Sequence, residues 1–528
     1  MSVASTVSAP SAGAPPAASA TRWWTLGIVS IATFMLMLDL TVVNVALPDL
    51  RTALHADFSD LQWVLDAYAL TLAAFLLTGG SLADRLGRKR IYGIGFVVFT
   101  AASLACGAAT GILALNLARG VQGIGAAVLF AVGPALVGQE FRGKDRAVAF
   151  GVFGGVSGLA IAFGPLIGGA LTDGIGWRWI FLVNVPIGLV AMVLGALRIP
   201  ESRDPAAHRV DYAGLGVFSA ALGLLVLGFL RGESLGWTSA AVLGMFGGSV
   251  VLLVLFAVIE RRLGEAAMLD LGLFRNRTFN GISVATLLGN AAGMAAIFLE
   301  VSYMQNVLGY SPLATGLRFL PLTLTLFVAA AVTGSLTASV PPRLLVGTAI
   351  AVMSAGLFLV TLVQPGSGWT AMLPAMLLTG LGMGMFNPPR SALAIGVAEP
   401  AKAGMAAGIG ETFQQVGIAI GIAGFGALFQ HRVTDAFAHS AAGRALGPQA
   451  TEGGRTVAAG AGRELAASVP VPLRSAVATA AREAFVHGLT EVLVGCGAVA
   501  AAGALAGFLF VRTRDLHESA LAGAELGH

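Results

Sequence analysis

The feature that most constrains this chain is a long series of apolar stretches, each of the length that a helix needs to cross a lipid bilayer. Such a helix takes roughly 20 predominantly apolar residues. By that rule the sequence predicts about fourteen spanning helices, lying approximately at 23–47, 60–82, 91–112, 115–138, 147–171, 179–198, 212–231, 237–259, 279–307, 316–338, 344–363, 370–396, 404–428 and 485–511. We therefore expect an all-α integral membrane protein.

The composition is that of a protein solvated mainly by lipid. Of the 528 residues, 56% are hydrophobic and only 11% are charged, whereas about 25% are charged in a typical soluble domain. The 71 glycines suit close contacts between helices in a membrane. The net charge of +4 comes from cations in short loops without interleaved aromatic residues, so we expect no nucleic-acid partner. Cys106 and Cys496 lie in apolar segments and form no disulfide framework.

The distribution of arginine and lysine predicts the orientation of the chain. Loops on the cytoplasmic side of a membrane protein carry an excess of these residues. With a cytoplasmic N-terminus, clusters such as Arg85–Arg90 and Arg261–Arg277 fall inside, and the short outer loops keep few cations. Those few are Arg51, Arg178, Arg231 and Arg318. We therefore predict a multi-pass protein of the cytoplasmic membrane with both termini in the cytoplasm.

The helix count divides the chain into two halves joined by a linker. The sequence GSLADRLGRK at 80–89 is faintly echoed by GSLTASVPPR at 334–343, as in transporters built from related halves. The predicted units are a disordered tail at 1–21, a six-helix bundle at 22–199, a linker with two further helices at 200–278, a second six-helix bundle at 279–513 that includes an outer loop at 429–484, and a cytoplasmic tail at 514–528.

The loop Gly79–Arg90, with sequence GGSLADRLGRKR, lies between two of the apolar stretches. Adjacent glycines at a helix end let another helix approach closely. The loop resembles the signature G-x-L-A-D-R-x-G-R-K/R of the major facilitator superfamily, which implies two six-helix bundles that rock about a central site. An ordinary basic loop is the alternative. The resemblance implies a gating role for Gly80, Asp84, Arg85, Gly87 and Arg88.

Asp39 lies deep in the first apolar stretch, in the segment Met37–Pro48 with sequence MLDLTVVNVALP. A charged residue at the centre of a bilayer costs about 2.5–3.5 kcal/mol even on lenient insertion scales, so an acid there is a candidate proton carrier. The segment resembles the L-D-x-T-I-V-N-V-A-L-P signature of the fourteen-helix drug:proton antiporters in this superfamily. The alternative is a structural acid that bonds to a neighbouring helix.

Other ionisable residues inside the predicted helices extend the set of proton-coupling candidates. Arg119 lies in a segment that resembles the R-x-x-Q-G element of this family, whose arginine assists proton transfer, and a fixed positive charge favours loss of a proton from a nearby acid. The alternative for Arg119 is a structural pairing with carbonyl groups at a helix end. Asp66 follows Gln62 by four residues and shares its face, with a solvated structural role as the alternative. Glu300 and Glu411 are expected to line the second half's side of a central cavity.

Polar neighbours of these acids are expected to contact the substrate. Tyr303 shares a helix face with Glu300, and Gln414 and Gln415 follow Glu411 at spacings of three and four residues, which gives that helix an unusually polar face. The predicted substrate-binding residues are Asn44, Gln122, Tyr303, Gln414 and Gln415.

Small residues fill the fifth apolar stretch, in Gly154–Gly158 and Ala162–Gly169. They permit close packing, and Pro165 is expected to kink the helix. The run resembles the antiporter signature G-x-x-x-G-P-x-x-G-G, which in the family distinguishes exporters from symporters and uniporters. Generic glycine packing is the alternative. The resemblance implies a conformational role for Gly164, Pro165, Gly168 and Gly169.

The sequence contains no HExxH, GxGxxG or phosphate-binding GxxxxGK[ST] motif, so we expect no enzyme, no metal site and no cofactor. The resemblance implies a monomeric, proton-coupled antiporter that exports lipophilic or cationic drugs or antibiotics by alternating access. One alternative is a proton-coupled importer or uniporter of a small metabolite on the same fold. The other is a membrane sensor or scaffold that transports nothing.

Overall fold

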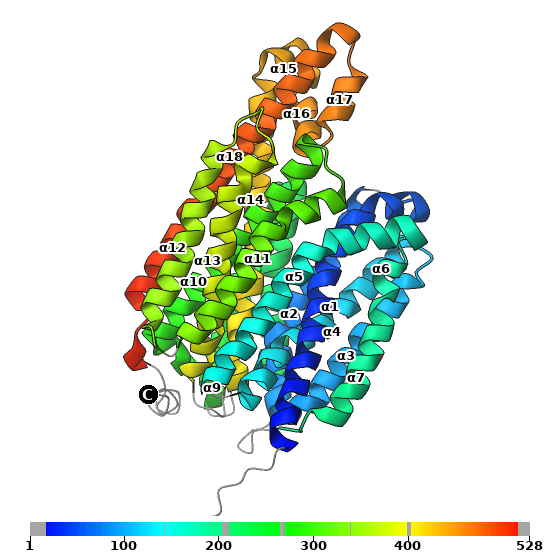
Figure 1. Ribbon diagram of the computed structural model, residues 1–528. Helices are drawn as coiled ribbons and strands as arrows, with labels where there is room; N and C mark the ends of the chain where they lie inside the picture. The colour runs from blue at the N-terminus through cyan, green and yellow to red at the C-terminus, as the bar shows by residue number, and fades with distance from the viewer. Residues whose placement is uncertain are drawn as a thin grey trace, which may run out of the picture.

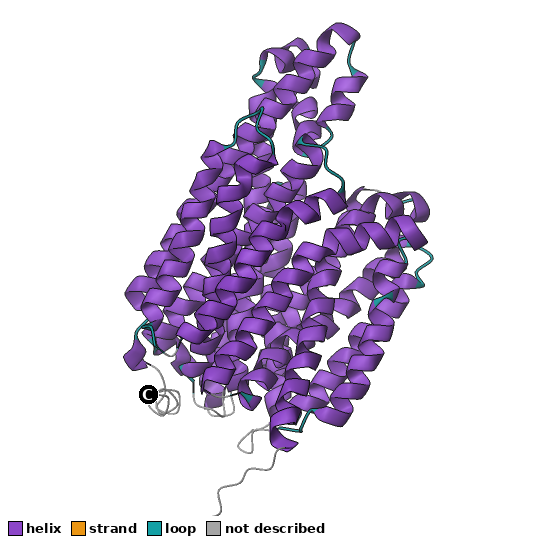
Figure 2. Cartoon of the chain, in the orientation of Figure 1, coloured by secondary structure: helices purple, strands orange, loops and turns teal. Residues whose placement is uncertain are grey.

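The computed structural model describes most of the chain, and every regular element in the part it describes is a helix (Figure 2). The described residues are 17–56, 58–141, 143–202, 211–264, 269, 271–337, 339–398 and 403–515. The expected tails fall largely outside them, at 1–16 and 516–528.

The first half is a bundle in which α1 packs on α5, α2 on α4, and α3 on both α4 and α7. Its helices are α1 (Ala17–Leu54), α2 (Phe58–Leu86), α3 (Arg88–Gly107), α4 (Ile112–Glu140), α5 (Gly143–Ile175) and the consecutive α6 (Trp179–Leu182) and α7 (Asn184–Arg198).

The second half repeats this arrangement with later helices, pairing α11 with α13, α12 with α18, and α10 with both α14 and α18. Its helices are α10 (Arg277–Ser302), α11 (Pro312–Leu336), α12 (Pro342–Phe358), α13 (Leu373–Gly396), α14 (Ala403–Ala438) and α18 (Val471–Phe510). Two linker helices, α8 (Tyr212–Leu235) and α9 (Ala240–Leu263), pack on each other, and α8 also contacts α2 and α14.

Capping side chains mark where several of these helices begin. Asp211, Asn276 and Ser311 each accept a hydrogen bond from the backbone N–H three residues on, at 2.8, 3.1 and 3.2 Å. A cap of this kind satisfies one of the N–H groups that the first turn of a helix leaves unpaired. The sequence therefore fixes the starts of α8, α10 and α11 locally.

The expected all-α membrane fold is confirmed. Thirteen helices in the described part of the chain are long and apolar enough to cross a membrane. The helix α5, with 33 residues, occupies the place of the fifth expected span. Together these helices account for the fourteen apolar stretches of the sequence.

Both described termini lie at one end of the bundle, called the terminal end below (Figure 1). At the other end a helical projection stands above the bundle, made of α15 (Ala441–Ala445), α16 (Ala450–Ala458), α17 (Gly462–Ser468) and the outer turns of α14 and α18 (Figure 1). The sequence predicted a loop over 429–484, and the structure differs because this segment buries apolar residues at helical spacing. Phe437 and Val477, each 0% exposed, pack there with Val457.

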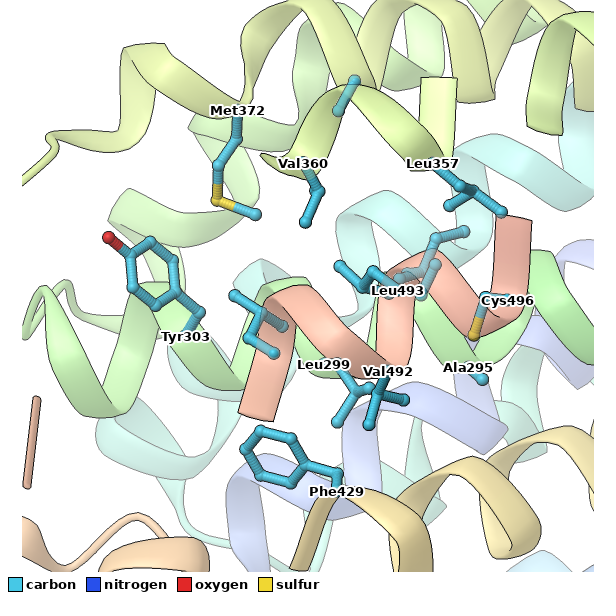
Figure 3. Packing of buried hydrophobic residues seen from close by; sticks show 14 of the residues in the cluster. Ala295, Leu299, Tyr303, Leu357, Val360, Met372, Phe429, Val492, Leu493 and Cys496 are labelled. Atoms are coloured by element: carbon cyan, nitrogen blue, oxygen red, sulfur yellow. The ribbon is translucent and has the colours of Figure 1, made fainter. Parts of the chain in front are cut away.

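Each half has its own apolar core. In the second half, Leu299, Phe429 and Val492 meet where α10, α14 and α18 come together (Figure 3). Lipid gives little hydrophobic drive for helix association, so close contact has to come from small residues. A Cβ on Gly125 would lie 2.5 Å from the backbone nitrogen of Phe99, which means that α3 and α4 touch through their backbones.

The two halves meet along α2 with α14 and along α5 with α11. Near the terminal end, a Cβ placed on Gly408 of α14 would lie 3.6 Å from Leu77 Cδ1 and 3.9 Å from the Cα of Gly80. Gly80, one of the residues with an expected gating role, therefore faces a second glycine across the boundary between the halves.

Candidate functional site

A cavity of about 100 Å³ lies between the two halves. The first half contributes side chains of α1, α4 and α5, and the second half contributes side chains of α10, α11, α13 and α14. Most of the wall is apolar, and the charged or amide-bearing lining residues are Asn290, Asn387, Arg390, Glu411 and Gln414. The charged residues of the wall thus come from the second half.

An ion pair forms the polar centre of this cavity. Arg390 Nη2 of α13 donates to Glu411 Oε1 of α14 at 3.0 Å, and both side chains are only 5% exposed. Removing one partner of a buried pair leaves an uncompensated charge, at a cost of about 3–5 kcal/mol. Each residue of the pair therefore compensates the charge of the other while the cavity is closed.

Two polar atoms at the cavity have no hydrogen-bond partner among the described residues. They are Arg390 Nε and Gln414 Oε1, one a donor and the other an acceptor. Buried polar atoms are nearly always paired with protein or water. The cavity can therefore receive a water molecule or a polar group of a ligand at this point.

The cavity is small for a drug-sized ligand, which needs roughly 300–1,000 Å³. At about 100 Å³ it holds a few water molecules. Since Gly154 of α5 would bring a Cβ within 3.4 Å of Asn387 Cβ, the two halves are closed tightly against each other at this level. A larger substrate can enter only when the halves separate.

A second buried polar network lies inside the first half. Asp39 of α1 forms an ion pair with Arg119 of α4, and both side chains are at most 1% exposed. Asp39 Oδ1 also accepts hydrogen bonds from Gln122 Nε2 at 3.0 Å and from Asn184 Nδ2 at 3.2 Å. Helices α1, α4 and α7 therefore converge on one carboxylate.

Besides its ion pair with Asp39, the Arg119 side chain makes two hydrogen bonds and an aromatic contact. Its Nε donates to the carbonyl of Val64 at 2.9 Å, its Nη1 also donates to Gln122 Oε1 at 2.7 Å, and its guanidinium lies 4.2 Å from the ring centre of Tyr68. A cation over an aromatic ring is stabilised by the negative face of that ring. The arginine thus ties α2 into the network around Asp39.

The two polar centres lie on different faces of α1. Met37, Leu40 and Thr41 line the central cavity, whereas Asp39 does not and points into the first half. Gln122, predicted to bind substrate, belongs to this inner network as well. A ligand in the closed central cavity therefore cannot touch Asp39 or Gln122.

Asp66 pairs with the linker. Its Oδ2 lies 3.6 Å from Arg231 Nη2 of α8, and the Arg231 guanidinium stacks 4.2 Å from the ring centre of Trp63. The sequence placed Arg231 in an outer loop, but it lies in the last turns of α8 and is 9% exposed. This contact joins the linker to α2.

Glu300 does not line the central cavity, contrary to the expectation from sequence. It is 0% exposed, and neither of its carboxylate oxygens has a hydrogen-bond partner in the described part of the chain. Tyr303, also predicted to reach the cavity, lies in the core of the second half (Figure 3) and donates to the carbonyl of Ser367 at 3.2 Å. Gln415 is buried but is absent from the cavity wall.

The loop between α2 and α3 is built around Asp84 and Arg88. Arg88 Nε and Nη2 lie 2.9 and 2.8 Å from Asp84 Oδ1, and Nη1 donates to Gln139 of α4 at 2.8 Å. Arg85, also expected to act in gating, is half-buried at the end of α2. The loop therefore joins three helices of the first half at the terminal end.

Glu201, which follows α7, binds the loop between α2 and α3 through its carboxylate. Its carboxylate accepts from the backbone N–H of Lys89 at 3.1 Å, in the first turn of α3, where a negative charge is favoured. Gly87 adopts φ 110, and a Cβ there would lie 2.8 Å from Glu201 Oε1. The positive φ favours glycine at this turn, because other residues rarely adopt that backbone conformation.

The glycines of α5 set its contact with α1. A Cβ on Gly168 would lie 2.8 Å from Val42 Cγ2, and one on Gly164 would overlap Thr41 Oγ1. Gly169 is half-buried on the same helix. The side chains of Gln62, Asn44 and Pro165, which the sequence singled out, lie outside the described residues.

The transport and the gating role that the resemblance implies can be tested at the contact between Gly408 and Gly80. Gly408→Ala adds a Cβ at ordinary van der Waals distance from its neighbours, so we expect transport close to wild type. Gly408→Leu drives a larger side chain into Leu77 and should hold the halves apart at the terminal end, slowing transport at least tenfold. Transport rates in vesicles compare the two variants, and wild-type rates for Gly408→Leu would contradict the gating role.

Three asparagines of these sites were not singled out from the sequence, and Arg390 was expected only to cap or pair within the second half. Asn290, Asn387 and Arg390 line the cavity, and Asn184 donates to Asp39. Each of the three asparagines carries an amide inside a predicted membrane span, which is a usable signal because an unpaired amide is costly in lipid. For Arg390 the signal was its charge inside a span.

Comparison with known proteins fits this architecture of two halves around a central cavity. A family model described as Major Facilitator Superfamily matches residues 29–422. The chain belongs to the major facilitator superfamily. It is therefore a membrane transporter of that superfamily, as the loop Gly79–Arg90 indicated.

Relatives of this major facilitator transporter include antibiotic resistance proteins and transporters. The puromycin resistance protein pur8 of Streptomyces alboniger is 36% identical over 409 residues, which cover 76% of this chain and 80% of the relative. The probable actinorhodin transporter of Streptomyces coelicolor is 34% identical over 429 residues, covering 79% and 74%. The proton:xylose symporter XylE, at 15% identity, has the same fold, with a TM-score of 0.60 over 96% of this chain and 99% of that one.

Proposed function

We propose that this protein is a proton-coupled antiporter that exports lipophilic or cationic compounds of the antibiotic class across the cytoplasmic membrane. The observation that carries the proposal is the Arg390–Glu411 pair, the charged centre of an otherwise mainly apolar cavity between the halves. Resistance and transport functions among the relatives support the substrate class. The terminal end, where Arg88 and its basic neighbours lie, is the cytoplasmic end in this proposal.

The chemistry of the cavity supports exchange of a proton for a substrate. When the halves open outward, protonation of Glu411 neutralises its carboxylate and releases Arg390. When they open toward the cytoplasm, loss of that proton restores the negative charge, which a cationic substrate can compensate. Because the proton and the substrate use one carboxylate, binding of one favours release of the other.

The buried network of Asp39 and Arg119 supplies a second titratable centre. Asp39 accepts hydrogen bonds from three side chains and is closed to the cavity in the present conformation. A proton reaches it only when the first half rearranges around α1, which also lines the cavity. In this proposal, protonation of Asp39 therefore accompanies the rocking of the halves rather than substrate contact.

The proposal is tested with inside-out vesicles that carry a respiration-driven proton gradient, read by a pH-sensitive dye. A panel of cationic dyes and aromatic antibiotics is added to vesicles with and without the protein. Antiport is expected to give substrate-dependent loss of the gradient and uphill uptake of labelled substrate. Movement of substrate out of the vesicles together with protons would instead indicate a symporter, and no response to any compound would contradict the proposed substrate class.

A further inference from the structure

A second hollow, of about 400 Å³, lies at the terminal end between the start of α10 and the residues that follow α18. It is far more basic than the central cavity. Its lining residues are Arg275, Asn276, Arg277, Arg512, Arg514 and Asp515. The transport mechanism proposed above makes no use of it.

The hollow is built by hydrogen bonds between two segments that are distant in sequence. The hydroxyl of Thr278 accepts from the backbone N–H of Arg512 at 2.7 Å and lies 2.9 Å from Asp515 Oδ2. Asn276 Nδ2 donates to the carbonyl of Asp515 at 2.9 Å. The arginines are therefore held together by the fold, because residues 512–515 are fastened to the first turn of α10.

The charges in this hollow are unbalanced. Four arginines surround one acid, Asp515, which lies 3.9 Å from Arg514 Nε. Among the described residues, Arg275, Arg277 and Arg512 form no ion pair. Positive charges that the fold brings close together repel one another, and a bound anion offsets this repulsion. The guanidinium group of arginine can donate paired hydrogen bonds to the oxygens of a phosphate. The hollow therefore has the chemistry of a phosphate site.

The surface beside the hollow is suited to lipid chains. In the last turns of α18, Leu505, Leu509 and Phe510 are 58%, 64% and 48% exposed. This part of α18 runs along the outer edge of the bundle to the terminal end (Figure 1). A molecule whose phosphate sits among the arginines can therefore lay its hydrocarbon along α18, as anionic phospholipids do at basic pockets between membrane helices.

We propose that this hollow binds the phosphate headgroup of an anionic phospholipid, with its acyl chains against the end of α18. The lipid phosphate then offsets part of the positive charge of the three arginines that form no ion pair within the described residues, and it fastens α10 to α18. This site is independent of the central cavity and of the direction of transport.

Binding of short-chain phosphatidylglycerol and phosphatidylcholine to the purified full-length protein tests the proposal, read by native mass spectrometry and by the shift in melting temperature. We expect phosphatidylglycerol to bind at least tenfold more tightly and to raise the melting temperature. Equal binding of the two lipids would overturn the proposal. Glycerol 3-phosphate is the soluble probe, and if it bound as tightly as phosphatidylglycerol, the ligand would be a soluble phosphate compound instead.

Charge-matched variants locate the site. The variant Arg275→Gln/Arg277→Gln/Arg512→Gln should lose the preference for phosphatidylglycerol. If it fails to fold, the single variant Arg277→Gln, at an exposed position, should still weaken that preference severalfold.

The control variant Arg261→Gln/Arg262→Gln/Arg343→Gln removes three exposed cations from helix ends outside the hollow. It should keep the preference of the wild type. An equal loss in both triple variants would mean that only the total charge matters and would overturn the assignment to this hollow.

Discussion

Glu411→Gln is expected to abolish coupled export, lowering substrate-dependent proton movement in vesicles at least tenfold. Glutamine keeps the shape of the side chain but cannot take up or release a proton. It also leaves the guanidinium of Arg390, which lies 3.0 Å from the carboxylate in the wild type, without its counter-charge. Substrate binding should weaken most for cationic compounds, because the negative charge of the cavity is gone.

Two further variants separate the loss of the proton site from a loss of folding. Glu411→Asp keeps the charge on a shorter side chain, so partial transport is expected. Glu491→Gln removes an acid of α18 that pairs with Arg432 at 3.4 Å and is absent from the cavity wall, so normal transport is expected. A folded Glu411→Gln protein with wild-type proton movement would show that coupling depends on another acid.

The sequence predicted the fold well because the membrane simplifies the problem. A helix that crosses a bilayer needs a certain length of apolar residues. That length can be recognised in the sequence without knowing which residues the helix contacts. The loop Gly79–Arg90 indicated the superfamily in a different way, through its resemblance to a known signature. The sequence does not show how each helix is rotated about its own axis. A helix that is apolar all round gives no sign of which side faces its neighbours.

The sites illustrate this difficulty. Glu300 and Glu411 look alike in sequence, as single acids in apolar helices, yet only Glu411 reaches the cavity and Glu300 is buried in the core. The partner of Glu411 lies on another helix, so the spacing of residues in the sequence does not predict that Arg390 pairs with it. The same holds for Asp39, whose neighbours Arg119 and Asn184 are brought to it only by the packing of α1, α4 and α7.

The helical structure of the projection beyond 429 was not predicted, for a different reason. Its short helices are rich in alanine and glycine and carry scattered charges, which is also the composition of a loop. What makes it helical is contact, as in Gly454, where a Cβ would lie 2.7 Å from the carbonyl of Thr434. Such a contact between α14 and α16 cannot be read from either segment alone.

The pair of Asp39 and Arg119 is expected to be the largest single electrostatic contribution to the stability of the first half. Asp39→Asn and Arg119→Gln should each lower the free energy of unfolding by about 3–5 kcal/mol, since each strands the opposite charge in a buried site. The double variant Asp39→Asn/Arg119→Gln should lose less than the sum of the two, with a coupling of about 0.5–3 kcal/mol. Unfolding by denaturing detergent in mixed micelles measures these differences.

The same double variant decides whether Asp39 is a proton carrier or only a structural acid. If the carboxylate takes part in coupling, a folded double variant should fail to drive uphill export, because asparagine cannot carry a proton. If the pair only fastens helices together, a folded double variant should still transport. Wild-type uphill export by a folded Asp39→Asn protein would exclude the proton-carrier role directly, and Glu411 in the central cavity would then remain as the coupling site.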